Sequence, residues 1–300
     1  MTDAGSTSAD TVPERARSSR RRSGLLSIRR SRTAMAGAIM LVVLAITAAF
    51  APQLATHDPF KQDLRARLVP PVWVAEGSSA HILGTDQLGR DILSRVIYGT
   101  RVSLLVGVSV VVIAGVVGTL LGLLAGFLGG RVDTLLMRTV DVFLAFPFLL
   151  LAIIFMAMLG ASLGNIILVL SITGWVEYAR VVRSQVLSVR ELEYITAAKA
   201  LGAHTLPIML KHVLPNVVAS VIVIGSLQLG TVIIAEASLT VLGLGIPPSI
   251  PTWGSMLATG REYFVLAWWL PTFPGLAIVV TVLAVNFLGD WLRDVFDPTL

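Results

Sequence analysis

Apolar residues along the chain gather in six long stretches that polar segments separate. A helix of roughly 20 apolar residues crosses the hydrocarbon core of a bilayer, and each stretch is close to that length. The pattern therefore predicts an all-α, multi-pass membrane protein with six transmembrane helices. The predicted spans cover residues 35–54, 102–128, 140–159, 164–182, 217–241 and 264–288.

Composition agrees with this prediction. Hydrophobic residues make up 55% of the 300 residues and charged residues only 14%, and the mean hydropathy is +0.83. Soluble domains carry about a quarter charged residues. The apolar run at 33–54 is longer than the core of about 7–15 residues in a signal peptide, and no small-residue cleavage site follows it. We therefore expect it to be retained as the first transmembrane helix.

Arginines concentrate before the first span, and they set the expected orientation. Cytoplasmic flanks of membrane helices are enriched in Lys and Arg, so we expect the amino terminus inside and, with six spans, the carboxyl terminus inside as well. Residues 1–32 lack apolar periodicity and are predicted to form a disordered basic tail in the cytoplasm. Nucleic-acid binding is not expected, because these arginines flank a span instead of covering a folded domain. They are Arg15, Arg17, Arg20, Arg21, Arg22, Arg29, Arg30 and Arg32.

The cytoplasmic loop at 190–216 mixes polar and apolar residues at helical spacing. Its first half predicts one short helix, Gly202 interrupts the pattern, and a second short helix follows, with Thr205 as its cap and an end near Pro215. Glycine at the break permits a left-handed backbone, so the helices can meet at a tight turn. Periodicity alone leaves two interpretations open: an amphipathic loop between spans, or a docking element. The apolar positions are Leu192, Ile195, Ala198, Leu201, Leu206, Met209, Leu210 and Val213.

The same loop resembles the EAA loop of binding-protein-dependent ABC importer permeases. That motif reads Glu-Ala-Ala, three residues, Gly, nine residues, Ile-x-Leu-Pro, and the spacing matches here; Thr196 replaces the Glu and His212 replaces the Ile. In the family this loop is the coupling helix, which sits in a groove of a cytoplasmic ATPase subunit. The resemblance implies that the ATPase contacts Glu193, Thr196, Ala197, Ala198, Gly202, His212, Leu214 and Pro215.

The segment at 55–101 is expected outside the cytoplasm and contains HILGTDQLGRDILSRVIYGTRVSL. Its residues alone are also consistent with an interfacial helix whose charges are solvated. Gly-Thr-Asp-x-x-Gly-Arg-Asp, followed by Leu-Ser-Arg and Tyr-Gly-x-Arg, resembles the signature of the C-type subunit of dipeptide and oligopeptide permeases. The resemblance implies that Asp86, Arg90 and Asp91 touch the substrate-binding protein or gate the pore.

Glu236 is predicted to be an ionisable residue deep in the fifth span. A charge is costly in lipid, so we expect it to face the bundle interior, a partner subunit or water; alternatively it reaches the outer interface. The surrounding segment, AEASLTVLGLGIPPSIPTWGSML, resembles the family's segment at this place. This resemblance implies that Glu236 and Trp253 lie near the translocation path.

Three further patterns concern packing. Gly118, Gly122 and Gly126 recur every four residues, which favours close contact between two membrane helices, although these glycines could also line a pore. Phe146-Pro147-Phe148 predicts a kink in the third span. The third pattern lies in the carboxyl-terminal segment, which also resembles the family. Its charged residues recur at three- and four-residue spacing, which predicts ion pairs along a helix: Asp290, Arg293, Asp294 and Asp297.

Several chemistries lack the residues they need. The chain has no cysteine, and none of its three lysines is followed by Ser or Thr, so it has no Walker A phosphate cradle. The four histidines all lie outside the predicted spans, and no His-Glu-x-x-His motif occurs. We therefore expect no catalytic site, no metal site and no cofactor in this chain, with ATP and Mg²⁺ bound by partner subunits. The histidines are His57, His81, His204 and His212.

The resemblance covers residues 25–300 and implies a type I ABC importer permease in the bacterial plasma membrane. Residues 102–300 are the expected permease core with five spans. The expected partners are a B-type permease in a heterodimer, two ATPase subunits and an external substrate-binding protein. Dipeptides or oligopeptides are the expected cargo; nickel and glutathione remain alternatives. An ion-coupled secondary transporter is a further alternative. Two observations count against it: the spans contain a single clearly buried Glu, and the sequence shows no evident inverted repeat.

Overall fold

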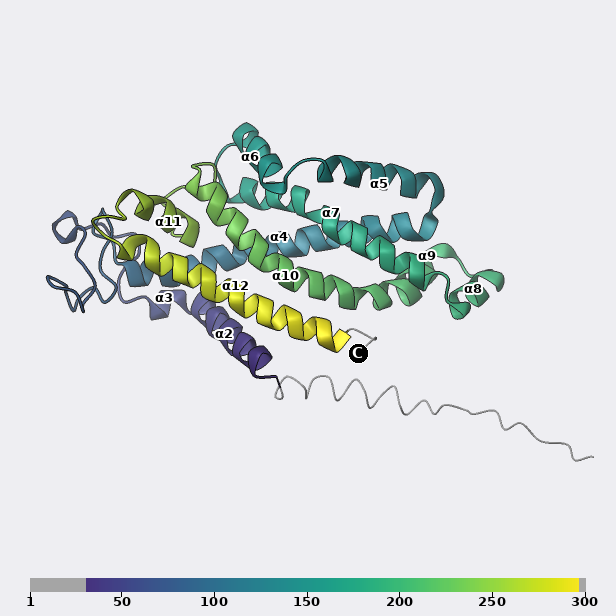
Figure 1. Ribbon diagram of the computed structural model, residues 1–300, viewed down its shortest axis with the longest axis horizontal. Coiled ribbons are helices and arrows are strands. Elements are labelled where there is room, and N and C mark those ends of the chain that lie inside the picture. Colours follow the sequence, from purple (N-terminus) through teal and green to yellow (C-terminus); the bar gives the residue numbers. More distant parts are fainter. Residues whose placement is uncertain (1–30, 297–300) are drawn as a thin grey trace, which may run out of the picture.

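The computed structural model describes residues 31–296, and in this range the protein is an elongated bundle of long helices without a β-strand (Figure 1). Most of the predicted basic tail, residues 1–30, and Asp297 lie outside the described residues. Within residues 31–296, five helical stretches are long and apolar enough to cross a membrane. They are α2 (Arg32–Ala49), α4 (Ile92–Leu128), α7 (Leu163–Val189), a stretch from Thr205 that contains α10 (Leu214–Val241), and α12 (Trp269–Phe296).

The third predicted span is wrong as one continuous helix. Its residues belong to α5 (Gly130–Leu144) and α6 (Phe148–Leu159), which meet at an angle of 87°. The break falls at Pro147, which has no N–H to donate and disfavours a helical conformation at the residue before it. The predicted kink is therefore confirmed as a full break. The described residues contain a sixth candidate span only if the bent pair is counted as one.

Helices α4 and α7 form the centre of the bundle, and the glycine stripe of α4 lies between them. A Cβ added at Gly122 would lie 2.9 Å from the Cβ of Val182, and one at Gly126 would lie 2.8 Å from the Cβ of Val186. Distances this short leave no room for a side chain. The predicted packing role of the stripe is confirmed, because only glycine allows these two helices to approach so closely.

Two helix boundaries differ from the predictions at one end of the bundle. Helix α4 starts at Ile92, ten residues before the predicted span, so the expected interfacial helix is the first part of α4 itself. Asp91 caps this start, since its carboxylate accepts a hydrogen bond from the N–H of Ser94 at 2.8 Å. The last span begins at Trp269, five residues after the predicted start.

The same end of the bundle carries most of the irregular backbone. Helix α2 is followed by the short α3 (Ala51–Leu54), and the chain up to Asp91 contains only the 3₁₀ turn η2 (Leu64–Ala66). Backbone hydrogen bonds join distant parts of this segment. For example, the N–H of Leu68 donates to the carbonyl of Asp86 at 3.1 Å. Helix α11 (Trp253–Glu262) lies beside it (Figure 1).

Candidate functional site

The loop with the EAA-like spacing projects from the end of the bundle opposite the irregular segment (Figure 1). It contains α8 (Glu193–Ala200), a turn at Gly202, and α9 (Thr205–Ile208). Gly202 has a φ of +79° and no neighbouring atom within 4 Å of an added Cβ, so a backbone conformation reserved largely for glycine produces the turn. The predicted order of helix, Gly break and helix is confirmed.

Two details of this loop were predicted wrongly. Thr205 is the first residue of α9 and not its cap; His204 precedes the helix, and no side chain caps it. The second helix also does not end near Pro215. It continues through the π-helical turn η3 (Met209–Val213) into α10. Pro215 occupies the first turn of α10, where a proline is tolerated because N–H groups at that position have no partner within the helix.

A buried apolar cluster fixes α8 to the bundle. Ile195 is completely buried and packs with Val186 of α7, Ile208 of α9 and Val213 of η3. On the polar side the amide of Asn216 donates to the hydroxyl of Tyr194 at 3.3 Å. The loop is therefore held at two places, so a force applied to α8 is passed to α7 and α10.

The tip of the loop is apolar and exposed. Leu201 is 89% exposed and Leu206 63%, one on each side of the glycine turn. Of the eight residues with an expected ATPase contact, Ala198 and Leu214 are half-buried and the other six are exposed. Thr196, at the position of the missing carboxylate, donates its hydroxyl to the carbonyl of Leu192 at 3.3 Å. The structure thus offers this surface for contact.

At the other end of the bundle, the expected contact residues are buried in an ion-pair network. The guanidinium Nε of Arg90 lies 2.6 Å from a carboxylate oxygen of Asp86, and that of Arg95 lies 3.7 Å from the same oxygen. Arg95 also donates to the carbonyl of Pro59 at 3.1 Å. The interpretation with solvated charges is therefore wrong, because Asp86, Arg90 and Asp91 are at most 6% exposed.

Glu236 and Trp253 are both buried inside the bundle. One carboxylate oxygen of Glu236 accepts hydrogen bonds from the hydroxyls of Thr240 at 3.1 Å and Thr252 at 3.4 Å; its other oxygen has no partner among the described residues. Trp253 is fully buried and donates its indole N–H to the carbonyl of Val96 at 3.2 Å. The expected interior position of Glu236 is confirmed, since it is 1% exposed.

Sequence reasoning missed further ionisable residues within the predicted spans, among them Glu177 of α7. Its carboxylate is exposed and accepts a hydrogen bond from the side-chain amide of Gln228 of α10. The pair lines a cavity of about 180 Å³, which Thr173 and Thr231 also line. A Glu inside an apolar run is itself a signal, because such a charge needs water or a protein partner in a membrane.

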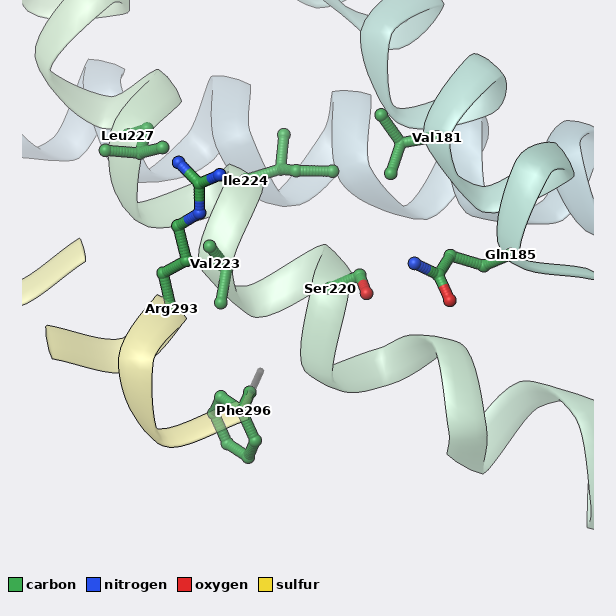
Figure 2. Close-up of a pocket in the computed structure, with 8 residues that line it drawn as sticks. All are labelled: Val181, Gln185, Ser220, Val223, Ile224, Leu227, Arg293 and Phe296. Atoms are coloured by element: carbon green, nitrogen blue, oxygen red, sulfur yellow. The ribbon is translucent and has the colours of Figure 1, made fainter. Parts of the chain in front are cut away.

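A second cavity, of about 420 Å³, lies further along the same two helices. Figure 2 shows Gln185 of α7 and Ser220 of α10 lining it, with Arg293 of α12 on its other side in that view. The predicted ion pairs of the last helix are wrong within the described residues, because Asp290, Arg293 and Asp294 form none there. Glu177 and Gln185 are eight residues apart, so they share one face of α7.

Comparisons with known proteins agree on one family. Residues 118–300 match the family described as binding-protein-dependent transport system inner membrane component, and residues 19–71 match the N-terminal TM domain of oligopeptide transport permease C. The di/tripeptide transport system permease protein DppC of Pseudomonas aeruginosa is 44% identical, with 91% of this chain and 90% of the relative covered. The dipeptide transport system permease protein DppC of Escherichia coli is also 44% identical, over 91% of each chain. The Bacillus subtilis DppC is 40% identical, over 91% of this chain and 84% of its own.

Proposed function

Because the chain belongs to the family of binding-protein-dependent transport system inner membrane components, we propose that it is the permease subunit of an ATP-driven importer for dipeptides or oligopeptides. The relatives named above carry peptide names, which supports this cargo over nickel or glutathione. Family membership likewise favours a binding-protein-dependent importer over an ion-coupled transporter. The chain is a transport component of the inner membrane.

The transporter that we propose contains four further components. A B-type permease pairs with this chain, two ATPase subunits bind ATP and Mg²⁺, and a substrate-binding protein delivers the peptide outside. The chain lacks a Walker A sequence, so hydrolysis belongs to the ATPase subunits. In this arrangement the α8 end and both termini face the cytoplasm, consistent with the arginines that precede α2.

The observation that carries this proposal is the geometry of the α8–α9 loop. Its exposed apolar tip, with Leu201 and Leu206, is a surface that a soluble ATPase subunit can cover. Its base is fixed by the buried Ile195, so movement of the tip reaches α7 and α10. ATP drives transport only if the ATPases bind the two permease conformations with different affinity, and a firmly anchored loop transmits that difference.

We place the translocation path along the polar face of α7 and α10, the face that carries Glu177, Gln185, Ser220 and Gln228. A carboxylate at the centre of a membrane helix costs about 2.5–3.5 kcal/mol in lipid, so Glu177 must face water or the second permease. A carboxylate and an amide carbonyl are suitable acceptors for the α-amino group that every free peptide carries. Glu236, Trp253, Asp86 and Arg90 are buried, and we assign them to supporting the outer end of the bundle.

Site-directed crosslinking tests the coupling assignment. The chain has no native cysteine, so single cysteines at Ala200 and Ala203 react without background. We expect each to crosslink to a co-expressed ATPase subunit, with a yield that changes when ATP is added. Ala75→Cys, an exposed position at the other end of the bundle, is the control and gives no such product. No crosslink from 193–211, in a complex shown to be assembled, would contradict the proposal.

A further inference from the structure

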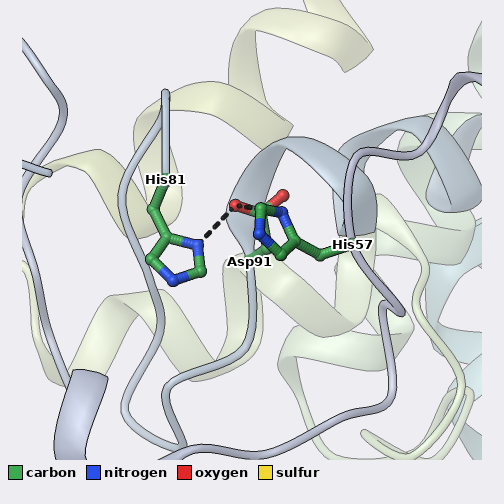
Figure 3. A group of neighbouring side chains, drawn as sticks. All are labelled: His57, His81 and Asp91. Atoms are coloured by element: carbon green, nitrogen blue, oxygen red, sulfur yellow. Dashed lines mark hydrogen bonds and ion pairs between the residues drawn. The ribbon is translucent and has the colours of Figure 1, made fainter. Parts of the chain in front are cut away.

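Three side chains from separate segments meet at the outer end of the bundle: His57, His81 and Asp91. Their ligand atoms, one nitrogen or oxygen from each residue, all lie within 4.8 Å of one another. Figure 3 shows both imidazole rings next to the carboxylate of Asp91, with a dashed line from His81 to one of its oxygens. The Nδ1 of His81 lies 2.9 Å from the Oδ1 of Asp91, and the Nδ1 of His57 lies 3.8 Å from the same oxygen.

The backbone around these residues is already fixed. The Oδ2 of Asp91 accepts hydrogen bonds from the backbone N–H of Ser94 at 2.8 Å and from its hydroxyl at 2.7 Å. The backbone N–H of His57 donates to the same Ser94 hydroxyl oxygen at 3.0 Å. The turn before α4 holds His81, whose carbonyl accepts from the N–H of Gly84 at 2.9 Å. One oxygen of Asp91 thus serves the helix cap, while the other points to the imidazoles.

Helix capping does not explain the second imidazole. At 3.8 Å the Nδ1 of His57 is too far from Asp91 for a hydrogen bond, and it pairs with the hydroxyl of Thr56 at 3.1 Å instead. The two rings still lie close together, with centroids 4.8 Å apart and planes at 36° to each other. We propose that His57, His81 and Asp91 form a binding site for a zinc-like divalent cation.

The donor set selects the class of cation. Two imidazole nitrogens and one carboxylate oxygen suit Zn²⁺ and its neighbours, whereas Mg²⁺ and Ca²⁺ prefer oxygen ligands alone. Three protein ligands leave a fourth position for water or for a group from a partner. In a tetrahedral site ligand atoms are about 3.4 Å apart, from metal bonds of about 2.0–2.2 Å. The more distant ligand atoms therefore have to move closer, while the 2.9 Å separation of His81 and Asp91 lengthens slightly. The His57 side chain is 40% exposed and has room to rotate inward.

A bound cation at this place would join three segments that are far apart in sequence. It would connect the residues after α3, the turn before Gly84 and the first residue before α4, and so stabilise the outer surface next to α4. The sequence alone predicted no metal site, because spacing does not show that His57 and His81 converge on Asp91.

Metal titration of the purified complex tests this inference. The complex carries a tag without histidine and this chain contributes no thiolate, so variants of this chain separate its own binding from that of the partner subunits. Zn²⁺ is titrated in competition with a chromophoric chelator, and Co²⁺ is added separately to record the visible absorption of a four-coordinate site. We expect one equivalent bound per chain. His57→Ala and His81→Ala should each weaken binding by about 100-fold or more, since losing even a supporting contact to a ligand costs about 10–100-fold.

Two sets of variants make the result decisive. Asp91→Asn keeps a residue that caps helices well but removes the charged ligand, so it should fold and bind zinc weakly. His204→Ala changes a histidine at the other end of the bundle and should bind zinc as the unaltered protein does. Absence of saturable binding, an affinity of His57→Ala and His81→Ala equal to that of the unaltered protein, or loss of binding only in His204→Ala would overturn the inference.

Discussion

Gly202 is the residue on which the proposed coupling loop depends. Its φ of +79° costs a residue with a side chain roughly 1–2 kcal/mol, but the surrounding space is open, so substitution should leave the protein in the membrane. Gly202→Asp adds strain and a charge between the apolar Leu201 and Leu206, where the ATPase is proposed to bind. We expect peptide uptake in membrane vesicles to fall at least about tenfold, the factor that 1.4 kcal/mol represents.

Gly243 provides the matched control for this substitution. It has a φ of +80°, equally open surroundings and the same pattern of backbone hydrogen bonds at a helix end as Gly202, but it follows α10 at the other end of the bundle. Gly243→Asp therefore introduces similar backbone strain away from the coupling loop, and uptake should stay near the unaltered rate. Equal loss of uptake in both variants would show that strain alone is responsible.

Glu177 supports a separate prediction about cargo. If its carboxylate receives the α-amino group of the peptide, Glu177→Gln replaces a charged hydrogen bond, worth about 1.5–3 kcal/mol, with a neutral one. The KM for dipeptide uptake should rise by about tenfold, and the amount of protein in the membrane should not change. Glu262→Gln, an exposed carboxylate on α11, is the control. An unchanged KM in Glu177→Gln would remove this residue from the path.

The sequence predicted some features of single residues and missed others. The turn at Gly202 followed from a glycine between two periodic stretches, because that signal is local. The burial of Asp86 and Arg90 did not, since Arg95, which pairs with Asp86, and the carbonyl of Pro59, which accepts from Arg95, reach this place only in the fold. Charged residues in a segment outside the membrane look solvated until their pairs are known.

At the scale of helices, the contact between α4 and α7 is the most exacting feature of the bundle. Gly122→Ala should destabilise it, because the added Cβ would lie 2.9 Å from the Cβ of Val182. Overpacking costs about 1–3 kcal/mol, so the unfolding temperature in detergent should fall. Gly164→Ala, in α7 with no atom within 4 Å of the added Cβ, should be neutral or slightly stabilising. Similar melting of both variants would contradict a tight contact.

Helix boundaries were the least predictable elements. Hydropathy located the apolar stretches but not the 87° break between α5 and α6, because apolar residues continue through Pro147. It also missed that α9, η3 and α10 form one continuous stretch: a proline usually suggests an end, and here Pro215 falls in the first turn of α10. Hydropathy reports burial in lipid, whereas these boundaries depend on backbone geometry.

At the scale of the whole molecule, the two ends of the bundle have different roles in the proposed transporter. One end presents the α8–α9 loop for the ATPases, and the other presents the folded segment before α4, with its proposed cation site, to the outside (Figure 1). The polar face of α7 and α10 connects them. Fold class and family were predictable from hydropathy and spaced motifs; the polar face was not, because it combines side chains of two helices.

Transport by the reconstituted complex tests the proposed function most directly. The chain is co-expressed with its partner subunits, placed in proteoliposomes, and supplied with binding protein and a labelled dipeptide while ionophores collapse proton and sodium gradients. We predict uptake that requires ATP and continues without either gradient. Uptake that persists without ATP and stops when the gradients collapse would contradict an ATP-driven importer.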